Sequence, residues 1–155
     1  MVPVKVSKHP DRQQVEKLFP FLDESAASEL CSSMEMCDID ENSCLFEAGD
    51  PCDAMYILVK GEMAVQKATG FGRNTQTIAL LQPHAPLGES AITGTTTRKS
   101  TVRAVKQSVL LRIEKQAYKN FAQKYPQAAI DLLHYLLAIV GLRLEKCSHR
   151  LAHIL

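Results

Sequence analysis

The sequence has 155 residues, of which 46% are hydrophobic and 23% are charged. Eighteen basic and seventeen acidic side chains leave a formal net charge of +1, which argues against a surface that coats nucleic acid, since such surfaces carry a clear basic excess. A chain of this length buries roughly 70% of its unfolded surface, so residues 1–155 are expected to form one domain without a disulfide or metal staple.

The N-terminal third is predicted to be helical over about residues 11–36. Val15, Leu18 and Phe19 share one helical face, and Asp23 is placed to cap a second segment after the break at Pro20. The first fourteen residues contain no continuous apolar core of the kind a signal peptide needs. We therefore expect a cytoplasmic protein.

Residues 37–113 have the residue pattern of a β-rich region. Runs of four to six residues rich in Val, Ile, Leu and Thr alternate with Gly, Pro, Asn and Asp, which predicts an antiparallel β-sandwich or barrel. Within it, "LVKGEMAV" predicts a hairpin that turns at Lys60 and Gly61, and "TGFGRN" predicts a second turn.

The five cysteines form no CxxC pair. Zinc sites and most iron–sulfur sites use cysteines two to four residues apart, so a metal role is not expected here. Reduced thiols that pack as small hydrophobic groups are the preferred interpretation. The cysteines concerned are Cys31, Cys37, Cys44, Cys52 and Cys147.

Helical patterning returns over about residues 115–154. A short helix is predicted over 115–124 with Tyr118 and Phe121 on one side, and Pro126 is suited to begin a long one. The long helix has an apolar stripe with alternating spacings of three and four residues, which indicates a parallel homodimer through residues 130–154. The alternative is a helix docked on its own domain, and residues 132–142 are too few to span a bilayer. The stripe comprises Ile130, Leu133, Leu137, Val140, Leu144, Cys147, Leu151 and Ile154.

The segment from Gly88 to Ala104, "GESAITGTTTRKSTVRA", contains the candidate site. Gly88 permits close approach of a backbone, and the small residues after it are able to begin a helical turn with free N–H groups. Arg98 has the planar donor geometry that holds a phosphate through two hydrogen bonds. Glu89 would repel a phosphate but accept from a sugar hydroxyl, which suggests a nucleotide. The alternative is a surface salt bridge of little energetic consequence.

The same segment resembles the phosphate-binding cassette of the cyclic nucleotide-binding domain family, with the patterns "LGESAI" and "RKSTV". The likeness extends over residues 19–144 and includes the strand and hairpin signature "LFEAGDPCDAMYILVKGEMAVQK". It implies a mainly β fold with flanking helices, namely an antiparallel jelly-roll barrel of the cyclic nucleotide-binding type with N-terminal helices and a long C-terminal helix.

The resemblance also implies roles for individual residues. Arg98 would pair with the cyclic phosphate, and Glu89 would accept from the ribose 2′-hydroxyl. Backbone groups of Gly88, Ser90 and Lys99 would line the phosphate and the sugar. Ser90 and Lys99 both depart from the family pattern, which prefers Leu at the first position and a small residue at the second.

Two further departures lie just before Glu89. Leu87 replaces the usual aromatic residue, and His84 stands near the position of a common turn glycine.

Two functions remain open from the sequence. The first is a regulatory module that binds cAMP or cGMP without a cofactor and signals through its dimer helix to a separate effector protein. The second is an interaction domain that keeps the fold without binding a nucleotide. An open pocket between Arg98 and the Gly88 backbone would favour the first, and a pocket filled by Lys99 the second.

Neither an enzyme nor direct contact with nucleic acid is expected, since the histidines are not clustered for metal binding and no helix-turn-helix follows the dimer helix.

Overall fold

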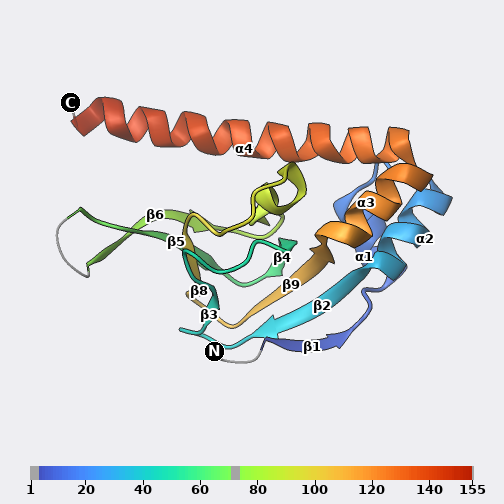
Figure 1. The fold of residues 1–155 in the computed structure, drawn as a ribbon, viewed down its shortest axis with the longest axis horizontal. Coiled ribbons are helices and arrows are strands. Elements are labelled where there is room, and N and C mark those ends of the chain that lie inside the picture. Colours follow the sequence, from blue (N-terminus) through green and yellow to red (C-terminus); the bar gives the residue numbers. More distant parts are fainter. Residues whose placement is uncertain (1–3, 71–73, 155) are drawn as a thin grey trace.

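The computed structural model describes residues 4–70 and 74–154. Helices gather at one end of a β-sandwich, and one long helix runs over the whole length of the molecule (Figure 1). The elements in chain order are β1 Lys5–Lys8, α1 Arg12–Leu18, α2 Glu24–Ser33, β2 Met34–Ile39, β3 Cys44–Phe46, β4 Ala54–Lys60, β5 Met63–Ala68, β6 Thr75–Leu81, β7 Pro86–Leu87, the 3₁₀ turn η1 Glu89–Thr93, β8 Thr101–Ala104, β9 Ser108–Glu114, α3 Lys115–Lys124 and α4 Pro126–Ile154.

The strands form two antiparallel sheets. One has the order β1-β2-β9-β4-β7 and the other the order β3-β8-β5-β6. Side chains from both sheets meet in one core, which includes Leu58 and Leu110 from the first sheet and Met63 and Val102 from the second. The predicted jelly-roll architecture with flanking helices is therefore confirmed, although the sheets do not close into a continuous barrel.

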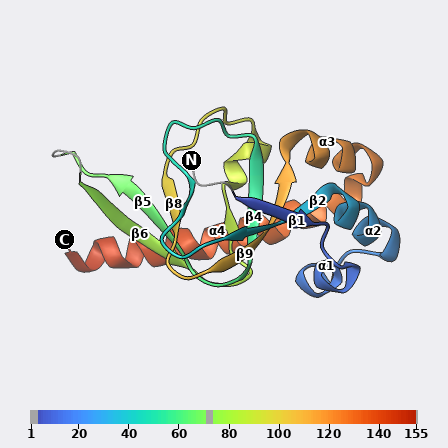
Figure 2. The same ribbon diagram turned by 90° about the horizontal axis from the view of Figure 1, so that it is seen from below.

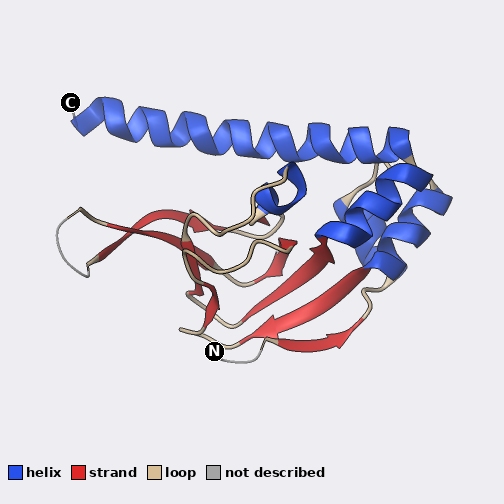
Figure 3. Ribbon diagram, viewed as in Figure 1, coloured by secondary structure: helices blue, strands red, loops and turns tan. Residues whose placement is uncertain are grey.

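A second core joins the first sheet to the helices. Because neighbouring side chains on a strand point to opposite faces, Met55 and Ile57 of β4 face the helices while Tyr56 and Leu58 face the other sheet. Phe19 and Phe121, which are fully buried, complete this helical core. The helices thus cover the outer face of one sheet at one end (Figure 3).

Two local predictions are wrong. The first helical region ends at Ser33 instead of continuing to residue 36, because Met34 already pairs with Ile113 in the sheet. The stretch "LVKGEMAV" is not a hairpin, since β4 pairs with β7 and β9 whereas β5 pairs with β6 and β8. Gly61 does turn the chain, with φ of 101°, but the turn carries it from one sheet to the other.

One further turn was predicted from the sequence, and one strand was not. The turn predicted in "TGFGRN" joins β5 to β6, where the Thr69 N–H donates to the Asn74 carbonyl over 2.9 Å; residues 71–73 lie outside the described part of the chain. Strand β1 was not predicted, because all four of its side chains are exposed and show no alternation.

Helix α4 begins at Pro126 as predicted and packs along the sandwich (Figure 2). Ala129, Leu132 and Leu136 are buried against the helical core. By length and composition this helix would be able to span a membrane, which the shorter run of residues 132–142 would not. In the folded chain, however, one of its faces is occupied by the rest of the protein.

Candidate ligand site

The cassette backbone turns at two glycines. Gly88 has φ of 63° and Gly94 has φ of 94°, and between them η1 forms a single 3₁₀ turn. Both values lie in the left-handed region that glycine adopts without steric cost. A Cβ atom on Gly88 would also lie only 2.3 Å from Arg98 Nη1, so this position requires glycine for space as well as for conformation.

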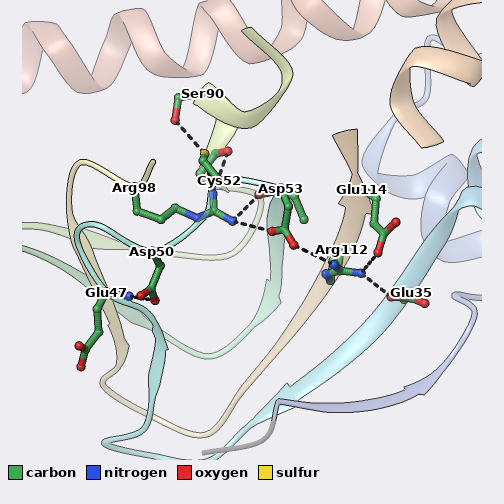
Figure 4. A network of polar contacts seen from close by, with 11 residues as sticks. Glu35, Glu47, Asp50, Cys52, Asp53, Ser90, Arg98, Arg112 and Glu114 are labelled. Atoms are coloured by element: carbon green, nitrogen blue, oxygen red, sulfur yellow. Dashed lines mark hydrogen bonds and ion pairs between the residues drawn. The ribbon is translucent and has the colours of Figure 1, made fainter. Parts of the chain in front are cut away.

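Arg98 is buried beneath this turn with 4% of its surface exposed. Nη2 donates to the Ala54 carbonyl over 2.7 Å, and Nη1 donates to Cys52 Sγ over 3.2 Å and to the Gly88 carbonyl over 3.4 Å. The guanidinium also lies over the Phe46 ring, 4.1 Å from its centroid. Figure 4 shows the Arg98 side chain reaching from its loop toward Cys52 and Asp53.

One donor of Arg98 remains without a partner. Nε is buried and donates to no oxygen or sulfur of the described residues. An unpaired buried donor on a charged group is unfavourable by roughly 1–3 kcal/mol or more. The guanidinium is thus held in place by the protein, while one of its N–H groups has no acceptor among residues 4–70 and 74–154.

A chain of charges runs from Arg98 across the sheet (Figure 4). Asp53 lies between two arginines, with Oδ1 3.7 Å from Arg98 Nη2 and Oδ2 3.8 Å from Arg112 Nη2. Arg112 Nη1 in turn donates to Glu35 and to Glu114, each over 2.9 Å. Burial lowers the pKa of Arg112, but these hydrogen bonds outweigh it and raise the pKa overall.

All five predicted site residues line one cavity of about 310 Å³. Its volume lies at the lower end of the range of small-molecule pockets, which is about 300–1,000 Å³. Lys99 does not fill the cavity: the side chain is exposed, and Nζ lies 3.4 Å from Thr97 Oγ1. The Arg98 guanidinium contacts the Gly88 carbonyl directly, so the open space lies beside these two groups and not between them. The predicted residues are Gly88, Glu89, Ser90, Arg98 and Lys99.

Helix α4 contributes the other wall of the cavity through Arg143 and Cys147. Arg143 Nη2 donates to the Pro86 carbonyl over 2.8 Å, and Nη1 lies 3.9 Å from Glu89 Oε1. The carboxylate expected to meet a sugar therefore already faces a cation. The alternative of a surface salt bridge between Glu89 and Arg98 is wrong, because Arg98 is buried and lies near Asp53, whereas Glu89 lies near Arg143.

Several residues of the site were not predicted from the sequence. Phe46, Cys52 and Asp53 lie within the strand signature but far from the cassette along the chain, and only the pairing of the strands brings them to Arg98. Arg143 carries no local signal at all, since it is one of several cations on α4. Arg143 could have been singled out only by recognising that it lies on the face of α4 that packs against the domain.

The match to a family model covers more than half of the chain. Residues 37–125 match the model of the cyclic nucleotide-binding domain. With the jelly-roll fold and the cassette in place, the chain belongs to the cyclic nucleotide-binding domain family.

Similar proteins are known both by sequence and by structure. A CRP-like cAMP-activated global transcriptional regulator of Mycobacterium tuberculosis is 20% identical over 138 residues, which is 89% of this chain and 59% of that protein. The chain thus spans little more than half the length of this curated relative. A cyclic nucleotide-binding domain from Methylobacillus flagellatus has a TM-score of 0.83 at 19% identity, covering 93% of this chain and 84% of that one. The catabolite activator protein of Thermus thermophilus has a TM-score of 0.70 at 23% identity, covering 88% and 62%.

Proposed function

We propose that this chain is a regulatory module that binds a cyclic nucleotide, cAMP or cGMP, in the cavity beneath α4. The observation that carries the proposal is Arg98, a buried residue that lines the cavity, is held by the protein through Nη1 and Nη2, and has no partner for Nε among the described residues. A cyclic phosphate supplies the acceptor oxygen that Nε lacks, and its negative charge strengthens the contact with the guanidinium. Membership of the family supports the same ligand class. No enzymatic role and no cofactor form part of the proposal.

The sugar is proposed to bind at Glu89, beside the phosphate. Glu89 is one-third exposed and faces the cavity, and its 3.9 Å distance from Arg143 is longer than a hydrogen bond. A ribose 2′-hydroxyl is therefore able to donate to the carboxylate without breaking a direct bond. The backbone around Gly88, Ser90 and Lys99 is proposed to hold the remaining oxygens.

Signalling is proposed to pass through α4 in a homodimer. The docked face of α4 carries Leu132 and Leu136. The predicted stripe is largely exposed in the single chain, apart from Val140, which is partly buried, and Cys147, which lines the cavity. Apolar residues at a and d positions become buried when two such helices pair. The exposed members of the stripe are Ile130, Leu133, Leu137, Leu144, Leu151 and Ile154.

The partner that receives the signal is proposed to be a separate protein in the cytoplasm. The balanced charge of residues 1–155 gives no reason to propose that these residues contact nucleic acid. The Mycobacterium tuberculosis relative is a transcriptional regulator that is longer than the matched region, so this expectation concerns residues 1–155 only.

The test of the nucleotide site is titration calorimetry with cAMP and with cGMP. We expect micromolar binding of at least one nucleotide by the wild-type protein. Arg98→Ala should weaken binding by about 2–5 kcal/mol, or roughly 30- to 5,000-fold, because the phosphate loses its charged partner. The comparison of the two nucleotides also determines which base is preferred.

Arg103→Ala is the matched control. Arg103 is a half-buried arginine on β8 that lies 3.8 Å from Glu47 and does not line the cavity, so its removal should leave nucleotide affinity unchanged. Absence of heat with either nucleotide, for wild-type protein shown to be folded, would overturn the proposed function and favour an interaction domain.

A further inference from the structure

A second cleft lies on the other side of Arg143, between α4 and the segment that leads from β6 to β7. Its volume is about 320 Å³, and its apolar walls include Leu80 and Pro83 on one side and Ile139 and Leu142 on the other. The cleft shares Ala79, Leu81 and Arg143 with the nucleotide cavity but contains neither Arg98 nor Glu89. It is an adjacent concave site with largely apolar walls.

The cations of the cleft come from one face of α4. Lys146 follows Arg143 by three residues, and Arg150 follows Lys146 by four. Side chains at these spacings lie on the same face of a helix, so the three cations line one wall of the cleft. No carboxylate lines the cleft among the residues that the structure describes. Like charges at these spacings repel each other, and only Arg143 has a carboxylate within ion-pair distance in the described chain. A bound anion would relieve this repulsion.

The two arginines are already oriented by the protein. Arg143 donates to the Pro86 carbonyl over 2.8 Å, and Arg150 Nη1 donates to the Ile78 carbonyl over 3.3 Å. A guanidinium has five N–H donors, so each of these contacts leaves donors for a ligand.

The opposite wall contains a residue in an uncommon backbone conformation. His84 has φ of 76°, which is rare outside glycine and is found with some preference at ligand sites. Its N–H donates to the Leu58 carbonyl over 2.7 Å, so the turn that forms this wall is tied to the sheet. The cleft thus has one fixed wall and one cationic wall.

We propose that this cleft is a second ligand site, selective for an organic anion with an apolar body and an acidic group. The apolar walls would take the body, and Lys146 and Arg150 would take the acidic group at the cationic wall. Inorganic anions alone would leave the apolar walls unfilled, so they should bind weakly. The occupant would bind beside the nucleotide and against the same helix.

The probe is 8-anilinonaphthalene-1-sulfonate, an apolar fluorescent anion, titrated into the full chain. The double variant Lys146→Gln/Arg150→Gln should weaken dye binding by roughly fivefold, since two exposed cations together contribute about 1 kcal/mol. The double variant Lys115→Gln/Lys119→Gln removes an equal charge at the same spacing on α3 and should leave dye binding unchanged. Thermal unfolding of each variant verifies that it is folded.

Two results would overturn the proposal. Equal dye affinity in both double variants would place the dye on the exposed apolar stripe of α4 instead of in the cleft. Loss of dye binding in Arg98→Ala, with retention in Lys146→Gln/Arg150→Gln, would place it in the nucleotide cavity. Because the cleft does not contain Arg98, its test is independent of whether the proposed nucleotide binds.

Discussion

At the scale of single residues, the site depends on how Arg98 is held. Its guanidinium has contacts with a thiol, two carbonyls and an aromatic ring, and Asp53 stands 3.7 Å away as the nearest carboxylate. A guanidinium with this many contacts keeps one geometry, so little rotamer entropy remains to be lost when a ligand binds. The cassette therefore presents a fixed cation to its ligand.

The fixed position of the Arg98 guanidinium is tested by substitution of Gly88. Gly88→Ala places a methyl group 2.3 Å from the present position of Arg98 Nη1, so the guanidinium has to move. We expect stability to fall by about 1–2 kcal/mol from the left-handed backbone conformation and nucleotide binding to be lost. Calorimetry and urea unfolding measure the two effects separately.

Gly94→Ala is the matched control for Gly88→Ala. Gly94 also has a positive φ, but nothing lies within 4 Å of an added Cβ atom. We expect a similar loss of stability with nucleotide affinity retained. If both variants bind nucleotide equally well, the contact between Gly88 and Arg98 does not position the phosphate site.

At the scale of elements, strand β2 contains a thiol that is shielded from solvent in the folded protein. It lies between β1 and β9, and Cys37 on this strand has no exposed surface. Burial raises the pKa of the Cys37 thiol to about 11. The folded state therefore favours the neutral thiol more strongly than the unfolded state does.

This shift predicts a pH dependence of stability. Below pH 9 the thiol is protonated in both states; as the pH rises from 9 toward 11, only the unfolded chain loses the proton, and stability falls. Between pH 8 and pH 10 the wild-type protein should lose about 1 kcal/mol more than Cys37→Ala. Urea unfolding under reducing conditions at the two pH values measures the difference. If the stability difference between the wild-type protein and Cys37→Ala is the same at both pH values, the pKa of the Cys37 thiol is not raised by folding.

At the scale of the whole molecule, α4 connects the two cavities to a free apolar face. One face of the helix packs on the protein and supplies Arg143 to the cavity that Arg98 and Glu89 line. The stripe with Leu144, which is 67% exposed, faces solvent in the single chain. A second copy would bury this stripe and couple the cavities of two chains.

The dimer is tested by sedimentation of the full chain. Leu144→Glu introduces a charge into the centre of the stripe, which should convert a dimer into a monomer because a buried unpaired carboxylate is strongly unfavourable. Ala138→Glu is the control, since Ala138 is exposed on α4 but outside the stripe. A monomer in the wild-type protein would refute the dimer, and a dimer in both variants would place the contact elsewhere.

The sequence by itself determined the order of the elements and the members of the cassette. Apolar runs separated by turn residues predicted the β-rich region, though not β1, and the start of α4 at Pro126 and the limits of α3 follow from local rules on caps and periodicity. Glycines such as Gly88 are recognisable because a conformational requirement acts on one residue at a time. Local physical requirements leave local signals.

Only the tertiary structure decided how these elements meet. It separates β4 and β5 into different sheets, brings Phe46 and Asp53 to Arg98, and gives Glu89 the partner Arg143. The physical reason is that such contacts depend on strand pairing and helix docking, which sum many weak interactions over the whole chain. No short stretch of sequence contains that sum, so the partners of a charged residue become known only when the fold has placed them.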